Sequence, residues 1–213
     1  MTAVFLDLDG TLMDSKPGIL SSLRHALEST GHGSIAEQDL TWMIGPPFQA
    51  SFEKAGIQDH TPVLEAYRVH YQATGMYDAQ VYDGVTGMMA GLDAFGARLY
   101  LATAKPHAYA TQITRHFGLA PAFQKEFGPE LDGTRGWKGD LLAYALELTG
   151  ETPDASVMVG DRHHDIAAGR QVGMPTIAVT WGYGTEEEWA DADVVVSSPS
   201  EVQGAVAGLM LGR

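Results

Sequence analysis

The chain has 213 residues, of which 45% are hydrophobic, and a formal net charge of −14. This length allows one medium-sized domain with a modest insertion. The acidic balance argues against a nucleic-acid polymer as partner, because binding to a phosphate backbone needs clustered Lys and Arg. A single small phosphorylated molecule is still compatible with a local cationic pocket. The sequence has no cysteine, which excludes disulfides, a thiol nucleophile and thiolate metal sites.

The sequence also carries no targeting pattern. Its first apolar run is short and meets Asp7, unlike a signal peptide. No stretch approaches the roughly 20 apolar residues of a membrane span. Together with the lack of cysteine, this predicts a cytoplasmic protein without a membrane partner. We expect it to be a monomer or a weak homodimer.

Short apolar, β-branched runs alternate with helical patterns along most of the chain. The predicted strands are Ala3–Asp7, Arg98–Thr103, Ser156–Asp161, Thr176–Trp181 and Asp193–Ser197, with a weaker candidate at Phe123–Gly128. The predicted helices cover residues 106–118, 138–149, 163–172 and 199–211. Strand–helix alternation predicts an α/β fold with a doubly wound, Rossmann-like parallel sheet and helices on both faces.

The first connection between strands breaks this rhythm. Roughly 90 residues separate Asp7 from Arg98, although a crossover needs only about a dozen. Four helices are predicted in this segment, at about 15–31, 36–43, 47–55 and 61–75. The sequence therefore predicts a small α-helical cap domain over 16–79, inserted into a catalytic core made of 1–15 and 80–213.

Acidic and hydroxyl side chains come at the ends of three predicted strands. Asp7 and Asp9 close the first, Thr103 the second, and Asp161 the strand that begins at Ser156. Ligands of open α/β sheets bind at this carboxyl edge. Residues 7 and 9 can face the same way, and Gly10 lets the backbone approach a ligand closely.

A cluster of carboxylates is typical of Mg²⁺, which takes one or two of them together with substrate phosphate. An EF-hand calcium loop does not fit, because Leu12 and Gly18 stand where that loop needs Gly and Glu. Asp9 taken alone also suits an ordinary Asp-Gly turn.

Two lysines, Lys105 and Lys138, stand at the starts of predicted helices, where the macrodipole disfavours a cation. A bound phosphate beside Asp7 and the metal would explain both positions. The alternative is a solvated surface lysine at either position.

These residues together resemble the haloacid dehalogenase-like superfamily of phosphohydrolases with a helical cap. The resemblance covers essentially the whole chain. It rests on four motifs in order: "DLDGTLMDS" at Asp7–Ser15, Thr103 in "LATAKP", Lys138, and "GDRHHD" at Gly160–Asp165.

The resemblance implies that Asp7 attacks phosphorus and forms an aspartyl phosphate. Asp9 would protonate the leaving alcohol and later take a proton from the hydrolytic water. Mg²⁺ would be held by the Asp7 carboxylate, the Asp9 backbone carbonyl and Asp161, with Asp165 acting through water.

The resemblance also implies a phosphate-binding set. Thr103 and the backbone N–H of Ala104 would hold phosphate oxygens, beside the turn at Gly10. Lys138 would neutralise both the nucleophile and the phosphate. The expected partner is therefore a small phosphorylated metabolite. Asp9 favours phosphate chemistry over dehalogenation, because dehalogenases of this family have no leaving alcohol to protonate and lack the second Asp.

Different sequence features point to different phosphate esters as the substrate. The size of the cap and the "IGPPF" loop at Ile44–Phe48 resemble phosphoglycolate phosphatases, which is the activity we expect first. Those enzymes usually place their lysine in a Lys-Pro-x-Pro stretch, however, and Glu130–Leu142 lacks it. The sequence around Lys138, and the segment "WGYGTEEE" after Thr180, are closer to proteins described as 5'-nucleotidase-like. A phosphoryl-accepting regulatory protein without turnover is the alternative from another class, although the long insertion argues against it.

Overall fold

The computed structural model describes residues 2–211 of the chain. The chain divides into two compact units: residues 2–13 with 81–211 form the first, and Asp14–Gln80 the second. The chain passes between them through two short strands, β2 (Met13–Asp14) and β3 (Gln80–Val81), which pair with each other. The domain limits proposed from the sequence lie within two residues of these division points.

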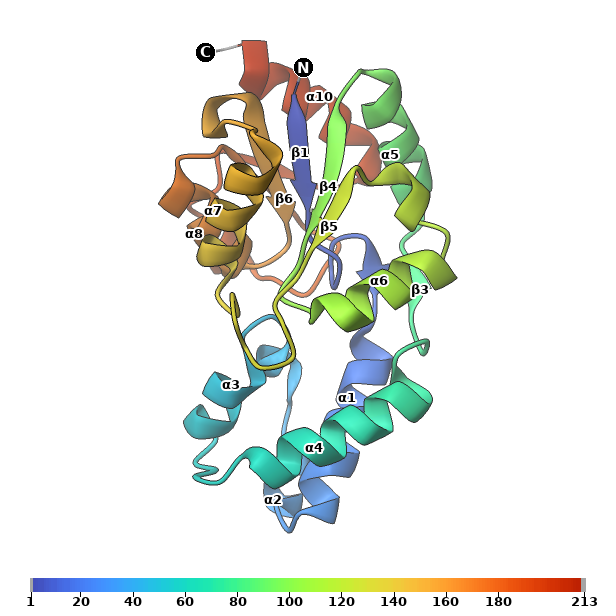
Figure 1. Ribbon diagram of the computed structural model, residues 1–213, viewed down its shortest axis with the longest axis vertical. Helices are drawn as coiled ribbons and strands as arrows, with labels where there is room; N and C mark the ends of the chain where they lie inside the picture. The colour runs from blue at the N-terminus through green and yellow to red at the C-terminus, as the bar shows by residue number, and fades with distance from the viewer. Residues whose placement is uncertain (1, 212–213) are drawn as a thin grey trace. The chain divides into compact units, whose positions relative to one another are not determined.

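The first unit is built on a six-stranded parallel sheet in the order β5-β4-β1-β6-β7-β8 (Figure 1). Its strands are β1 (Ala3–Leu6), β4 (Arg98–Ala102), β5 (Lys125–Phe127), β6 (Ser156–Gly160), β7 (Thr176–Val179) and β8 (Val194–Val196). β1 lies between β4 and β6, and all four of its residues are buried. Strands covered on both faces read as continuous apolar runs, which is why these segments were recognisable in the sequence.

Helices cover both faces of this sheet (Figure 1). They are α5 (Val85–Ala94), α6 (His107–His116), α7 (Lys138–Thr149), α8 (His163–Val172) and α10 (Pro199–Leu211), while the short α9 (Glu186–Trp189) packs on α8. α7 and α8 pack together on one face, and α5 packs with α10 on the other. On the α7 side the core includes Phe5, Tyr100 and Met158 from the sheet, against Leu142 and Ala145. The predicted α/β fold with a doubly wound parallel sheet is confirmed.

The second unit is helical. It contains α1 (Lys16–Ser29), α2 (Gly33–Ala36), a 3₁₀ turn at Thr41–Met43, α3 (Phe48–Lys54) and α4 (Thr61–His70), which runs on into a π-turn at Tyr71–Gly75. α1 packs on α4, and an aromatic cluster fills the space beside them. In that cluster the Phe48 ring lies 4.6 Å from the Tyr67 ring, which in turn stacks on Tyr71 at 5.3 Å.

The predicted helix over 36–43 is wrong. The chain forms α2 before this segment and a 3₁₀ turn at its end. The reason is local: Asp39 Oδ1 accepts hydrogen bonds from the Thr41 backbone N–H at 2.9 Å and from the Thr41 hydroxyl at 2.7 Å. A side chain that bonds the backbone two residues on favours a turn over a continuous helix.

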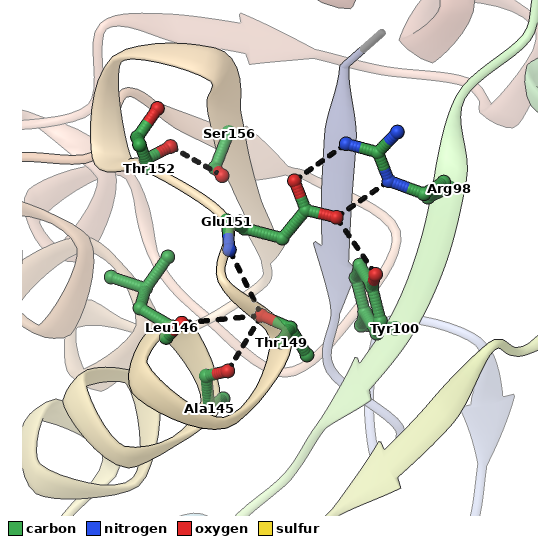
Figure 2. Close-up of polar contacts among 8 residues, drawn as sticks. All are labelled: Arg98, Tyr100, Ala145, Leu146, Thr149, Glu151, Thr152 and Ser156. Carbon is green, nitrogen blue, oxygen red and sulfur yellow. Dashed lines mark hydrogen bonds and ion pairs between the residues drawn. The ribbon is translucent and has the colours of Figure 1, made fainter.

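A polar cluster at the other end of α7 from Lys138 ties that helix to the sheet (Figure 2). The Glu151 carboxylate follows the end of α7 and accepts hydrogen bonds from Arg98 Nε at 2.5 Å and Nη2 at 2.6 Å. It also accepts the Tyr100 hydroxyl at 2.8 Å. Both partners belong to β4, so this one carboxylate joins α7 to a central strand.

We predict that Glu151→Ala lowers the free energy of unfolding by about 1–2 kcal/mol, because three charge-assisted or buried hydrogen bonds are lost. Glu147→Ala is the matched control, since Glu147 is an exposed acid of α7, four residues before Glu151. Chemical denaturation of both variants checks this. Equal stability of the two would show that the cluster contributes nothing measurable.

Candidate active site

The first strand delivers two carboxylates to one place. Pairing continues one residue past β1, where the Asp7 N–H donates to Val159 O at 3.0 Å. Leu8 is fully buried, so Asp7 and Asp9 lie on either side of a core residue. Gly10 then turns the chain with φ of +84°, and a Cβ there would overlap the Asp161 carboxylate. Only glycine is comfortable in this left-handed conformation so close to a side chain.

The second pair of carboxylates comes from the junction of β6 and α8. Asp161 follows β6 directly and is fully buried. Asp165 lies in the first turn of α8, and its Oδ2 accepts the Arg162 backbone N–H at 3.0 Å. Carboxylate oxygens of Asp7, Asp161 and Asp165 all lie within 4.8 Å of one another.

Lys138 begins α7 and reaches into this cluster. Its side chain is buried, with Nζ 2.8 Å from Asp7 Oδ1 and in contact with Asp165 Oδ1. The alternative of a surface lysine is therefore wrong at this position. A cation here opposes the helix dipole, and the two carboxylates more than compensate.

Lys105 is buried as well, with only 7% of its surface exposed. Its Nζ lies 3.0 Å from Asp9 Oδ2. The surface alternative is wrong for this lysine too. Asp7 and Asp9 are thus paired with different lysines.

The electrostatics of the cluster show an excess of negative charge. Burial raises the pKa of the Asp7 carboxyl to about 6; Lys138 opposes this rise and Asp165 adds to it. Burial, followed by the charges of Asp165 and Asp7, raises the pKa of Asp161 well above its ordinary value. Burial lowers the pKa of Lys138, but Asp165 and Asp7 outweigh it and the net shift is upward.

These residues fit a divalent cation. Four carboxylates (Asp7, Asp9, Asp161 and Asp165) meet two lysine ammonium groups, which leaves two negative charges uncompensated. Three of the carboxylates lie close enough to share an ion, and an all-oxygen set suits a hard cation such as Mg²⁺. Asp9 differs, because its carboxylate lies with Lys105 and is not part of this group of three.

The expected phosphate-binding residues lie at the end of β4. Thr103 follows the strand and is 1% exposed. Its Oγ1 accepts the Lys105 backbone N–H at 3.2 Å, so the hydroxyl hydrogen can point to another acceptor. Ala104 lies between these two residues and is partly buried. Gly10 and Lys138 complete the set from β1 and α7.

The sequence reasoning missed the segment that holds Asp161. Tyr183 N–H donates to Asp161 Oδ2 at 2.7 Å, and Trp189 Nε1 donates to the Asp161 carbonyl at 2.7 Å. Trp181 Nε1 donates to Thr11 O at 2.9 Å. The glycines in "WGYG" were the available signal: a Cβ at Gly182 would overlap Gly10 O and the Asp161 side chain.

The sequence predicts that the chain has no membrane-spanning segment. Across residues 2–211, no helix combines the length and the apolar content needed to cross a bilayer.

Comparison with known proteins identifies the family. Residues 4–179 match the family described as haloacid dehalogenase-like hydrolase. The chain is 42% identical over 183 residues to "Tyrosine-protein kinase PtkA" of Mycobacterium tuberculosis, covering 85% of this chain. It spans only 62% of that relative's length.

Two further relatives carry phosphatase-type names. The chain is 37% identical over 191 residues to a "5'-nucleotidase" of Pseudomonas aeruginosa, covering 87% of this chain and 85% of the relative. It is 29% identical over 189 residues to a "Phosphoglycolate phosphatase" of Agrobacterium fabrum, covering 85% and 81%.

A solved structure, described as a "predicted phosphatase" from Clostridium acetobutylicum, superimposes with a TM-score of 0.92 at 34% identity. The superposition covers 97% of this chain and 98% of that one. The match to the family over most of the core, together with relatives and a structure of this similarity, confirms the resemblance drawn from the four motifs: this chain belongs to the haloacid dehalogenase-like hydrolases.

Proposed function

We propose that the chain is a Mg²⁺-dependent phosphomonoester hydrolase that acts on a small phosphorylated metabolite through a phosphoenzyme on Asp7. The observation that carries this proposal is the buried Asp7 carboxylate, 2.8 Å from Lys138 and within 4.8 Å of Asp161 and Asp165. Such a carboxylate is a nucleophile whose charge is met by a fixed cation. That is the condition for attack on an anionic phosphate.

Two carboxylates divide the chemistry. In the first step, an Asp7 oxygen forms a bond to phosphorus while the bond from phosphorus to the leaving oxygen breaks, and Asp9 gives that oxygen a proton. In the second, water attacks the phosphorus, the bond to Asp7 breaks, and Asp9 takes the proton of the water. Asp9 is then protonated again, as it was at the start.

Other residues hold the phosphate while this happens. The Thr103 hydroxyl and the Ala104 N–H donate to phosphate oxygens, with the Gly10 turn close by. The Lys138 ammonium lies beside the nucleophile, so it reduces the repulsion between two anions and stabilises charge in the transition state.

The metal-binding residues are Asp7 through its carboxylate, Asp9 through its backbone carbonyl, and Asp161, with Asp165 acting through water. When bound, Mg²⁺ supplies positive charge that neutralises phosphate oxygens. Tyr183 and Trp189 support this arrangement, because they fix the Asp161 side chain and backbone by hydrogen bonds.

Two substrates are candidates. The sequence favours a phosphoglycolate-like ester first, through the cap and the Ile44–Phe48 loop. A 5'-nucleoside monophosphate is the second candidate, and the relative named 5'-nucleotidase supports it, because it is more similar to this chain than the relative named phosphoglycolate phosphatase. Asp14–Gln80 is proposed as the cap that chooses between them.

We predict that Mg²⁺ stabilises the folded protein more at pH 8 than at pH 5. Burial raises the pKa of Asp7 to about 6, so without metal the contribution of this carboxyl to stability is full below about pH 4 and is lost as pH rises through 6. Burial also raises the pKa of Asp161, so its contribution changes in the same direction. At pH 8 the Asp7 carboxyl is charged and free to bind the metal, whereas at pH 5 protons compete with the metal for it.

Thermal unfolding with and without Mg²⁺ at the two pH values measures this effect. A Mg²⁺ concentration about 100 times the dissociation constant adds about 2.7 kcal/mol to the free energy of unfolding. Asp161→Asn is the control and removes one ligand. If Mg²⁺ raised the unfolding temperature by the same amount at both pH values, the assignment of these carboxylates as metal ligands would be contradicted.

The activity is tested by phosphate release from 2-phosphoglycolate and AMP in parallel, with Mg²⁺ and again with EDTA. We expect turnover of at least one ester that EDTA abolishes. Asp7→Asn should lower the rate of phosphate release at least about 10³-fold, because the nucleophile is lost. Retained activity in Asp7→Asn would exclude the covalent mechanism. Stoichiometric phosphorylation without turnover would instead support the regulatory alternative.

Asp9→Asn tests the acid role. We expect a loss of about 10²–10⁴-fold in the single-turnover rate of alcohol release from an alkyl phosphate, whose leaving group needs a proton in this first step. p-Nitrophenyl phosphate should lose much less, because its leaving group departs as a stable anion. Comparable losses on both esters would remove Asp9 from this role.

A further inference from the structure

Lys105 has no role in the proposed reaction, yet its burial needs an explanation. Removing an ammonium group from water is costly unless an anion meets it. That anion is Asp9, with Oδ2 3.0 Å from Lys105 Nζ. The Asp9 side chain is also largely buried, at 14% exposed. The pair is therefore partly shielded from solvent, which strengthens its attraction relative to a surface ion pair.

The backbone of Lys105 is fixed on two sides. Its N–H donates to Thr103 Oγ1 at 3.2 Å. Gly128 packs so closely against the Lys105 carbonyl that a Cβ there would overlap it. Pro106 follows directly and restricts the conformation of the residue before it. These contacts fix the backbone position from which the Lys105 side chain extends toward Asp9.

The next turn anchors the same segment. The His107 N–H, at the start of α6, donates to Pro129 O at 2.8 Å. The segment that leads toward Lys138 is thus attached to the segment that carries Lys105. The two lysines approach the first motif from linked pieces of backbone, and each takes a different carboxylate.

We infer that Lys105 is a positioning residue for Asp9: it sets the orientation of the acid–base carboxylate relative to the leaving oxygen. This inference rests on the proposed function. In the first step, Asp9 loses its proton to the leaving oxygen and becomes a carboxylate. Lys105 holds that carboxylate in the place where it meets the hydrolytic water in the second step, so one geometry serves both proton transfers.

The competing explanation is that Lys105 binds the substrate phosphate directly. The two roles differ in what they depend on. A positioning residue acts only through Asp9, so its removal affects reactions that need proton transfer and has no effect once Asp9 is gone. A phosphate ligand acts on every substrate, with or without Asp9.

A double-mutant cycle separates these roles. The four proteins are wild type, Lys105→Met, Asp9→Asn and the double variant. Each is assayed with Mg²⁺ on p-nitrophenyl phosphate and on the better of 2-phosphoglycolate and AMP. Lys125→Met is the matched control, because Lys125 is an exposed lysine of β5 outside the site.

For Lys105→Met we expect the single-turnover rate of leaving-group release, which reports the first step, to fall at least ~10-fold on the alkyl ester and less than ~3-fold on p-nitrophenyl phosphate. The first step is compared because hydrolysis of the phosphoenzyme is common to both esters. In the Asp9→Asn background the same substitution should change neither rate by more than about 2-fold. Lys125→Met should match wild type.

Equal losses of the first-step rate on both esters, a rise in KM on both, or a loss that persists in the Asp9→Asn background would overturn the inference in favour of phosphate binding. No metal-dependent release from any ester by wild type would instead refute the proposed function, and this inference with it. If Lys105→Met does not fold, Lys105→Arg keeps the charge and changes its reach. A selective loss on the alkyl ester is expected for it, and an equal loss on both esters contradicts the positioning role.

Discussion

The crowding of four carboxylates at the carboxyl edge of one sheet is the constraint on which the rest of the first unit depends. Asp7, Asp9, Asp161 and Asp165 repel one another in a region with little water, and two buried lysines offset only part of that repulsion. The residual charge has a thermodynamic consequence: raised pKa values at Asp7 and Asp161, and therefore a folded state that gains from a divalent cation.

This constraint gives many neighbouring features a purpose. Glycines at 10, 160, 182 and 184 stand where a Cβ would overlap the carboxylates or the backbone around them. Indole and backbone N–H groups of the 181–189 segment point at Asp161 or at Thr11 O next to it. These hydrogen bonds and close backbone contacts hold the carboxylates at the separations that the proposed metal site needs.

How much of the fold and site could be predicted from the sequence depends on how far apart in the chain the interacting residues lie. β1 and β6 are short apolar runs that end at Asp7 and Asp161, so their pattern fixed both the sheet and the edge where the carboxylates meet. The helix over 36–43 failed because one side chain, Asp39, outweighed a weak apolar pattern. Contacts such as Trp189 with Asp161, 28 residues apart, have no local signal at all. The position of Lys105 before a helix indicated a nearby anion, but it did not indicate that this anion is Asp9, which lies almost a hundred positions away.

The pairing of the lysines also says something about how one site handles two kinds of carboxylate. In the proposed reaction the nucleophile must stay ionised as the phosphate approaches, and Lys138 at the start of α7 would serve that need at Asp7. In the proposed reaction an acid–base group must meet the leaving oxygen in one half and the hydrolytic water in the other, so its orientation matters. A separate lysine, fixed through the Thr103–Lys105 turn, allows Asp9 to be oriented independently of Asp7. Two carboxylates only two residues apart can then perform different chemistry because their counter-ions come from different strands and helices.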